Sequence, residues 1–382
     1  MKIETKKLKD ALNKLRHFTI RGDGKQGVNP CSMLVHFKSD GGKVMMFATD
    51  MANAARVRFD TDDQTCLDFC TKFANIEKAV RFKKNEIEMT LIESEGAIEF
   101  SDGKSKLKVA YEDGGSMGVM ESLKFIPETA KCIEFKAADL VEMFSFAGIA
   151  RDMKAKEQSI ELTCICFTTD FSTVCMKATD RKRISVWKSS EEVIDEVEDG
   201  MVQVLIPPDV AEFPGYFDAE STVRVYPLED GVIFADENFE AYGHTINKVF
   251  PQFGFLLKKK LIRKYSINAG QLMEAIDLIK DDSGKDEDHK RISFTFGEDS
   301  IKMSMKSNLF AADTDMPATL LENDGDAEDI TAGFKQMFLI ESMSRMKGED
   351  ITISLLESTR PGKCSMSYQC GTGGYGLFAQ LT

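Results

Sequence analysis

The chain has 382 residues, 42% of them hydrophobic, and its 63 acidic against 49 basic side chains leave a formal net charge of −14. This length predicts two or three domains with sizeable cores, and no apolar run approaches the ~18 residues that a membrane helix requires. The negative charge argues against a protein that holds DNA by surface affinity alone, because nonspecific DNA binding needs Lys and Arg to neutralise phosphates. The start, Met1 to Glu4, lacks the apolar stretch of a signal peptide, so we expect a cytoplasmic protein.

One apolar pattern occurs three times at one fixed spacing. The offset is 132 residues both times, from Leu8 to Leu140 and from Leu140 to Leu272. The three copies are Ile3, Leu8, Ala11, Leu12 and Leu15; Phe135, Leu140, Met143, Phe144 and Ala147; and Ile267, Leu272, Ala275, Ile276 and Ile279. A period this long is too large for a solenoid repeat and indicates three tandem copies of a whole domain.

The predicted elements follow one order in each copy. In copy one we expect a helix over residues 6–17, strands over 43–50 and 54–59, a second helix over 73–80 and a strand over 87–90. Copy two has strands over 173–180 and 183–187, a short helix over 208–213 ended by Pro214, and a strand over 223–226. Copy three has a strand over 301–308, a helix over 338–343 and a strand over 351–354. The fold class is therefore α+β, with two helices against antiparallel sheet in each of three domains, over 1–125, 130–256 and 264–382.

Patterns typical of enzymes are weak in this chain. Gly103-Lys104-Ser105 ends like a phosphate-binding loop, but Ile98 stands where the first glycine belongs. Asp50 and Asp180 follow equivalent strands, which favours turn caps over paired catalytic acids. Nine cysteines without a Cys-x-x-Cys pair indicate reduced core thiols. We expect no catalysis, no cofactor and no metal.

Three segments carry a resemblance to a known family. They are the run from Ala178-Thr179-Asp180 to Ile184, Phe250-Pro251-Gln252-Phe253, and the run from Gly103 to Val109. With the triplication, they make the chain resemble the bacterial-type DNA polymerase III beta sliding clamp. Arg181 and Lys182 replace the family's usual Gly-His, and the usual C-terminal Pro-Met-Arg-Leu-like ending is missing, so we expect a divergent member of phage or plasmid type.

The resemblance implies a non-catalytic homodimer. Two chains would join head to tail as a six-domain ring around duplex DNA and tether the replicative polymerase as a processivity factor. Polymerase and clamp loader would dock through short peptide motifs, with no membrane partner. A closed ring is held by topology, and acidic residues on its rim would lie beyond the Debye length of about 8 Å from the DNA.

Three groups of site residues follow. The DNA-facing group is Lys6, Lys9, Lys14, Arg16, Arg21, Lys25, Lys78, Arg151 and Lys154. The resemblance places the partner-peptide cleft at Leu162, Thr179, Arg181, Arg183, Ile184, Pro251, Phe253, Phe255, Leu256, Leu377 and Phe378. The dimer interface group is Lys104, Lys106, Leu107, Lys108, Ile276, Ile279, Asp313 and Asp315.

Each group has an alternative interpretation. The lysines of the first helix also fit a solvated helix face, and those of residues 104–108 also fit a strand edge protected against aggregation. Leu377 and Phe378 also fit the last strand of domain three. For the whole chain, the alternative is a monomeric clamp-like scaffold or decoy that binds protein without encircling DNA.

Overall fold

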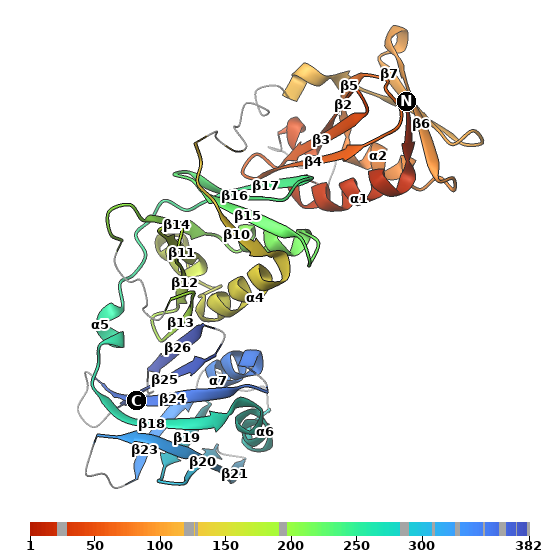
Figure 1. Ribbon diagram of the computed structural model, residues 1–382. Helices are drawn as coiled ribbons and strands as arrows, with labels where there is room; N and C mark the ends of the chain where they lie inside the picture. The colour runs from red at the N-terminus through yellow and green to blue at the C-terminus, as the bar shows by residue number, and fades with distance from the viewer. Residues whose placement is uncertain are drawn as a thin grey trace. The chain divides into compact units, whose positions relative to one another are not determined.

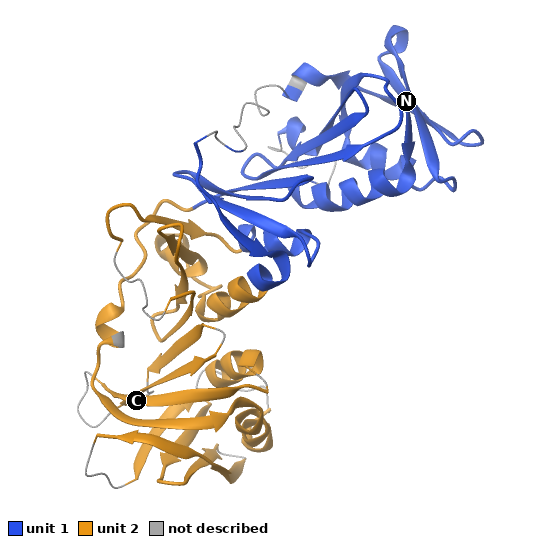
Figure 2. Cartoon of the chain, viewed as in Figure 1, with its two compact units in different colours: residues 1–141, 209–245 blue, residues 142–208, 246–382 orange. Residues whose placement is uncertain are grey.

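The computed structural model describes residues 1–20, 29–117, 126, 129–190, 197–282, 290–307, 310–324, 329–346, 348–358, 364–371 and 373–379. These residues form two compact units, coloured separately in Figure 2. Unit 1 contains residues 1–141 and 209–245, and unit 2 contains residues 142–208 and 246–382. The three domain boundaries inferred from the repeat stay a prediction.

Unit 1 contains two antiparallel sheets (Figure 1). The four-stranded sheet has the order β1 (Lys2–Glu4), β6 (Glu86–Ile92), β7 (Ala97–Ser101) and β8 (Lys106–Ala110). The nine-stranded sheet has the order β10 (Ile133–Lys136), β15 (Thr222–Pro227), β16 (Gly231–Ala235), β17 (Phe239–His244), β4 (Ala54–Asp60), β3 (Lys43–Thr49), β2 (Leu34–Asp40), β5 (Leu67–Lys72) and β9 (Glu112–Asp113). Strands from copies one and two of the repeat thus share one sheet, joined where β17 pairs with β4.

The helices of unit 1 pack their apolar faces on these sheets. α1 (Thr5–Leu15) buries Leu8, Leu12 and Leu15 and continues as a 3₁₀ turn over Arg16–Phe18. α2 (Phe73–Ala79) begins at the predicted residue and ends one residue earlier. The helix predicted over 208–213 is instead a 3₁₀ helix, η7 (Val210–Tyr216), with Pro214 inside it. The prediction that Pro214 ends the helix was wrong.

Unit 2 repeats this arrangement. Its nine-stranded sheet has the order β14 (Val202–Ile206), β11 (Ile165–Thr169), β12 (Val174–Thr179), β13 (Arg183–Lys188), β26 (Gly374–Ala379), β25 (Cys364–Cys370), β24 (Asp350–Glu357), β18 (Leu261–Asn268) and β22 (Thr319–Asn323). Its four-stranded sheet has the order β21 (Ala311–Pro317), β20 (Ser300–Lys306), β19 (Arg291–Phe296) and β23 (Ile330–Lys335). The remaining helices are α4 (Ala137–Ala147), whose first residues belong to unit 1, α5 (Gly254–Leu257), α6 (Ala269–Ile279) and α7 (Gln336–Met343).

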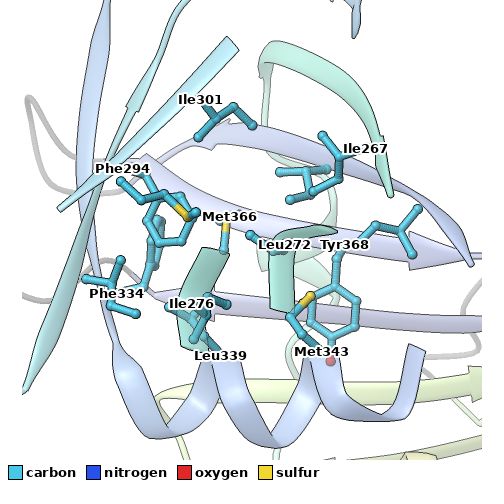
Figure 3. Close-up of a cluster of buried hydrophobic side chains, with 14 of the residues drawn as sticks. Ile267, Leu272, Ile276, Phe294, Ile301, Phe334, Leu339, Met343, Met366 and Tyr368 are labelled. Carbon is cyan, nitrogen blue, oxygen red and sulfur yellow. The ribbon is translucent and has the colours of Figure 1, made fainter. Parts of the chain in front are cut away.

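The largest core of unit 2 lies between its helices and both sheets. Leu272 and Ile276 of α6 meet Leu339 and Met343 of α7, with strand residues such as Phe294 beside them (Figure 3). Leu8, Leu140 and Leu272, one from each copy of the repeat, are all fully buried on the first helix of their copy. The repeated pattern therefore encodes one strand–helix unit three times.

Three hairpin turns share one set of hydrogen bonds. They begin at Thr49-Asp50, Thr169-Asp170 and Thr179-Asp180. In each, the Thr hydroxyl donates to the carbonyl four residues on at 2.7–2.8 Å. The Asp carboxylate accepts from the backbone N–H groups two and three residues on at 2.6–2.9 Å. Asp50 and Asp180 are therefore turn caps, as predicted.

Candidate functional site

The exposed face of α1 carries positive charge. Lys6, Lys9 and Arg16 are exposed, because the buried leucines of α1 leave these positions on the opposite side of the helix. The Arg16 guanidinium lies 3.7 Å from the Glu77 carboxylate on α2. Lys14 is half-buried, with its Nζ 4.9 Å above the Phe239 ring, so part of its charge is engaged within the protein.

The other predicted DNA-facing residues are dispersed. Lys78 is exposed on α2 of unit 1. Arg21 and Lys25 lie outside the described residues. In unit 2, Arg151 is half-buried and Lys154 is exposed, in the segment after α4.

The helices equivalent to α1 contain no Lys or Arg, whereas all three helices expose an acid at the position of Asp10, Glu142 and Glu274. The exposed residues of α4 include Asp139 and Glu142, and those of α6 include Glu274 and Asp277. Positive charge is therefore concentrated on the first of the three equivalent helices.

Several predicted cleft residues meet in one apolar cluster of unit 2. Ile184, Phe253 and Leu377 are each 3% exposed within it, and Leu256 packs against it half-buried. The sheet brings Ile184 and Leu377 together, because they are directly paired where β13 meets β26. Phe255, which precedes Leu256 in the chain, is 65% exposed. Val249 is a second exposed apolar residue, at 88% exposure, and it is not among the predicted cleft residues.

Arg183 and Phe378 do not belong to this face. They pair across β13 and β26 one position away from Ile184 and Leu377, so their side chains point to the other side of the sheet. The Arg183 guanidinium lies 4.3 Å from the Phe338 ring of α7, and the Phe378 ring lies 5.1 Å from Tyr368 in the other core. These two residues therefore lie on the face opposite the apolar cluster, because one position along a strand exchanges its faces; their place in the cleft stays a prediction.

The remaining predicted cleft residues are outside the apolar cluster. Thr179 pairs with Ile184 on β12 and β13 and is buried. Leu162 is 3% exposed, in the 3₁₀ segment over Glu157–Thr163, and Pro251 is half-buried.

Arg181 holds an unusual backbone conformation. Its φ is +69°, in the left-handed region that glycine adopts without steric cost. Its side chain is 63% exposed and points toward Glu161, with 3.8 Å between guanidinium and carboxylate. The side chain therefore contacts the 3₁₀ segment over Glu157–Thr163.

The predicted interface strand is a sheet edge. β8 is the terminal strand of its sheet, with Lys106 and Lys108 exposed and Leu107 half-buried between them. The Lys106 Nζ lies 2.9 Å from Glu99, and Lys108 pairs with Glu95. Lys104 stands in the preceding turn, where backbone N–H groups of Ser105 and Lys104 donate to Asp102 and hold the pKa of that carboxyl below its usual value.

The predicted acidic partner strand is also an edge. β21 ends the four-stranded sheet of unit 2 and exposes Asp313 and Asp315 on one face. Ile276 and Ile279, predicted to contribute apolar contact there, are fully buried in the core. That prediction was wrong, because these positions belong to the core-facing stripe of α6. The exposed apolar residue of α6 is Leu278, at 67% exposure, and α6 packs on β21.

Within the described part of the chain, no cluster of three His, Cys, Asp or Glu side chains has a metal-binding arrangement. Among the same residues, no helix combines the length and the apolar character needed to cross a membrane.

Comparisons of sequence and of structure both find DNA sliding clamps. No family model matches the chain. The beta sliding clamps of two Streptococcus pneumoniae strains are 23% identical over 191 residues, which cover 48% of this chain and 47% of each relative. The match thus spans about half the length of these curated relatives.

Solved structures match over the full length. The DNA polymerase sliding clamp of Bacillus subtilis aligns with a TM-score of 0.80 at 14% identity, over 100% of this chain and 98% of that one. The DNA polymerase III subunit beta of Pseudomonas aeruginosa gives 0.78 at 13%, and the Helicobacter pylori beta clamp bound to a DNA ligase peptide gives 0.77 at 16%, each over 100% of this chain and 99% of the other. The chain therefore has the beta sliding clamp fold along its whole length and resembles the DNA polymerase III beta subunits as a divergent relative.

Proposed function

We propose that this protein is a DNA sliding clamp: a homodimeric ring that encircles duplex DNA and tethers a replicative DNA polymerase, without catalysis of its own. The observation that carries the proposal is the fold match with the Bacillus subtilis clamp, which includes every part of this chain. The proposal places the protein in the cytoplasm and requires no cofactor.

Ring closure is assigned to the edge strands β8 and β21. Each leaves one side without a strand partner among the described residues, and such edges accept another strand. One edge belongs to unit 1 and the other to unit 2, so two chains joined head to tail would form two identical seams. Lys106 and Lys108 would face Asp313 and Asp315, while Leu107 and Leu278 would supply apolar contact.

The ion pairs of the β8 lysines limit what these lysines would add to the affinity of the interface. Lys106 and Lys108 already have carboxylate partners within their own sheet. Their contribution across the seam is therefore one of register and of partner choice more than of affinity.

DNA contact is assigned chiefly to α1. Its exposed Lys6 and Lys9, with Arg16 in the following turn and Lys78 of α2, are the exposed basic residues of unit 1 that we assign to DNA contact. A ring held by topology needs few such contacts, which reconciles DNA binding with a net charge of −14.

Partner docking is assigned to the apolar cluster around Ile184 and Leu377. The Helicobacter pylori clamp was solved with a DNA ligase peptide. In this chain, we place the peptide site at the apolar cluster that contains Ile184 and Leu377. Half-buried Leu256 and exposed Phe255 provide apolar surface that a short partner peptide would cover.

Negative-stain electron microscopy of the purified protein tests the proposal. Six-lobed rings with a central hole wide enough for duplex DNA are the expected class averages. Isolated three-lobed crescents at micromolar concentration would instead support the monomeric scaffold. Adding a nicked DNA circle distinguishes a ring that closes only on DNA, because such a ring would stay on the circle and be released when the circle is cut.

A further inference from the structure

Unit 2 contains a basic pocket on the helix side of its nine-stranded sheet. The pocket has a volume of about 500 Å³, and its lining includes Arg151, Arg183 and Arg345, with Glu341 as the acidic lining residue. Arg151 comes from the segment after α4, Arg183 from the start of β13, Glu341 from α7, and Arg345 from the 3₁₀ turn over Ser344–Met346 that follows α7. The fold thus brings together three arginines that are up to 194 positions apart, from Arg151 to Arg345.

Arg183 is the rigid base of this pocket. Its side chain is 6% exposed, its Nε lies 3.1 Å from Asp180, and it also pairs with Glu341. The Phe338 ring, 4.3 Å away, closes a further side. A guanidinium held on several sides presents its remaining N–H groups in a fixed direction.

Arg151 is also positioned by its surroundings. Its Nε donates to the Gly148 carbonyl at 3.2 Å. A Cβ at Gly148 would lie 3.0–3.2 Å from the Arg151 guanidinium, so the missing side chain leaves the space that this group occupies. Arg345 is exposed and forms no ion pair with any residue that the structure describes.

We propose that this pocket binds a backbone phosphate of duplex DNA. Arginine is suited to this role because its planar N–H groups match two phosphate oxygens at once. Lys154 and Lys156 follow Arg151 on the same segment and are exposed. On this segment Arg151, Lys154 and Lys156 outnumber Asp152 and Glu157, and several cations beside the pocket match a polyanion better than a single carboxylate of a partner peptide. The inference rests on the proposed function and adds to it a specific contact in unit 2.

The Glu341 carboxylate competes with a bound phosphate for the Arg183 guanidinium. Its carboxylate pairs with Arg183 while its side chain remains 43% exposed. A phosphate that enters must share or displace this partner, so removing the charge of Glu341 strengthens DNA binding. Neutralising Arg345 weakens it.

The experiment compares full-length Arg345→Gln, Glu341→Gln and the control Lys182→Gln, an exposed hairpin lysine absent from the lining. The probe is a fluorescent duplex oligonucleotide, measured by anisotropy over a range of KCl concentrations. Loss of one phosphate contact lowers the slope of log affinity against log salt by about 0.9. We expect this decrease for Arg345→Gln, tighter binding for Glu341→Gln, and wild-type behaviour for Lys182→Gln. Thermal melting establishes that each variant is folded.

The outcomes separate this site from the proposed function. If wild-type protein forms rings and binds the duplex while Arg345→Gln and Glu341→Gln behave as Lys182→Gln does, the phosphate site is refuted and the clamp stands. If the variants change only the binding of a poly-glutamate peptide, the pocket serves an acidic protein segment and the DNA assignment is wrong. If wild-type protein forms no ring and binds no duplex, both proposals fail.

Discussion

Arg181 lies in a hairpin turn that requires a left-handed backbone conformation. In the three Thr-Asp hairpins, the residue after the aspartate has a positive φ, and it is Met51, Phe171 or Arg181, never glycine. The hydrogen bonds of the Thr and Asp side chains hold these turns against the steric cost of the left-handed conformation. At Asp170 the backbone N–H groups of Thr173 and Ser172 keep the pKa of the carboxyl well below its usual value, so this cap remains charged in moderately acidic solution.

Replacing Arg181 with glycine should stabilise the protein. Relief of the left-handed strain exceeds the entropy that glycine adds to the unfolded chain, and we expect the free energy of unfolding to rise by about 0.5 kcal/mol. Lys182→Gly is the matched control: Lys182 is the next residue and has no positive φ, so we expect this variant to lose about 0.5–1 kcal/mol of unfolding free energy. Urea unfolding measures the free energy of unfolding of both variants. Equal destabilisation by the two variants would show that Arg181 is not strained.

At the scale of elements, the informative features are the two strand edges. β8 and β21 each end a four-stranded sheet, and their exposed faces carry opposite charges. A free edge with exposed lysines also resists unwanted pairing. Only a change in oligomeric state distinguishes protection of an edge from its use in an interface.

Charge reversal on β8 should therefore break the proposed dimer. In Lys106→Glu/Lys108→Glu, the new acids would face Asp313 and Asp315 and also Glu99 and Glu95 of their own sheet. We expect the mass in solution to fall from twice 42.7 kDa toward 42.7 kDa, as measured by analytical ultracentrifugation. Lys248→Glu/Lys258→Glu makes the same change in net charge at exposed positions outside both strands and should leave the dimer intact. An unchanged mass for the β8 variant would remove this strand from the interface.

At the scale of the whole molecule, the acidic chain concentrates its basic helix surface in one place. α1 exposes Lys6 and Lys9 beside Asp10, whereas the equivalent helices α4 and α6 expose Asp and Glu and contain no Lys or Arg. A ring built this way would contact DNA at a few positions and leave the rest of its wall weakly repulsive. Such a distribution suits a tether that must move along its template.

Removing the α1 lysines should weaken contact with DNA and leave assembly unchanged. For Lys6→Ala/Lys9→Ala we expect the salt slope of duplex binding to fall by about 1.8, because each lost phosphate contact contributes about 0.9. Lys43→Ala/Lys248→Ala removes two exposed lysines from outside the helices and should have no such effect. Anisotropy with the duplex oligonucleotide measures both, and an unaltered slope for the α1 variant would move the DNA contacts elsewhere.

The elements of this protein are largely readable from local sequence. β3, β12, α2 and α7 lie within two residues of their predicted bounds, because side-chain periodicity follows directly from strand and helix geometry. The triplication, and with it the fold class, follows from the same pattern repeated at a fixed offset. The end of η7 was predicted wrongly, because Pro214 would interrupt an α-helix whereas this 3₁₀ helix continues through it.

The sequence by itself determined the repeat, the α+β class and the likeness to sliding clamps, because these depend on short-range patterns. Only the tertiary structure decided which face each side chain occupies. Ile184 and Arg183 are neighbours in sequence, yet the pairing of β13 with β26 sends one into the apolar cluster and the other into the basic pocket. Ile276 and Leu278 of α6 divide in the same way between core and surface. The reason is physical: periodicity is a property of the local backbone, whereas burial is decided by contacts between strands and helices that are far apart in the chain.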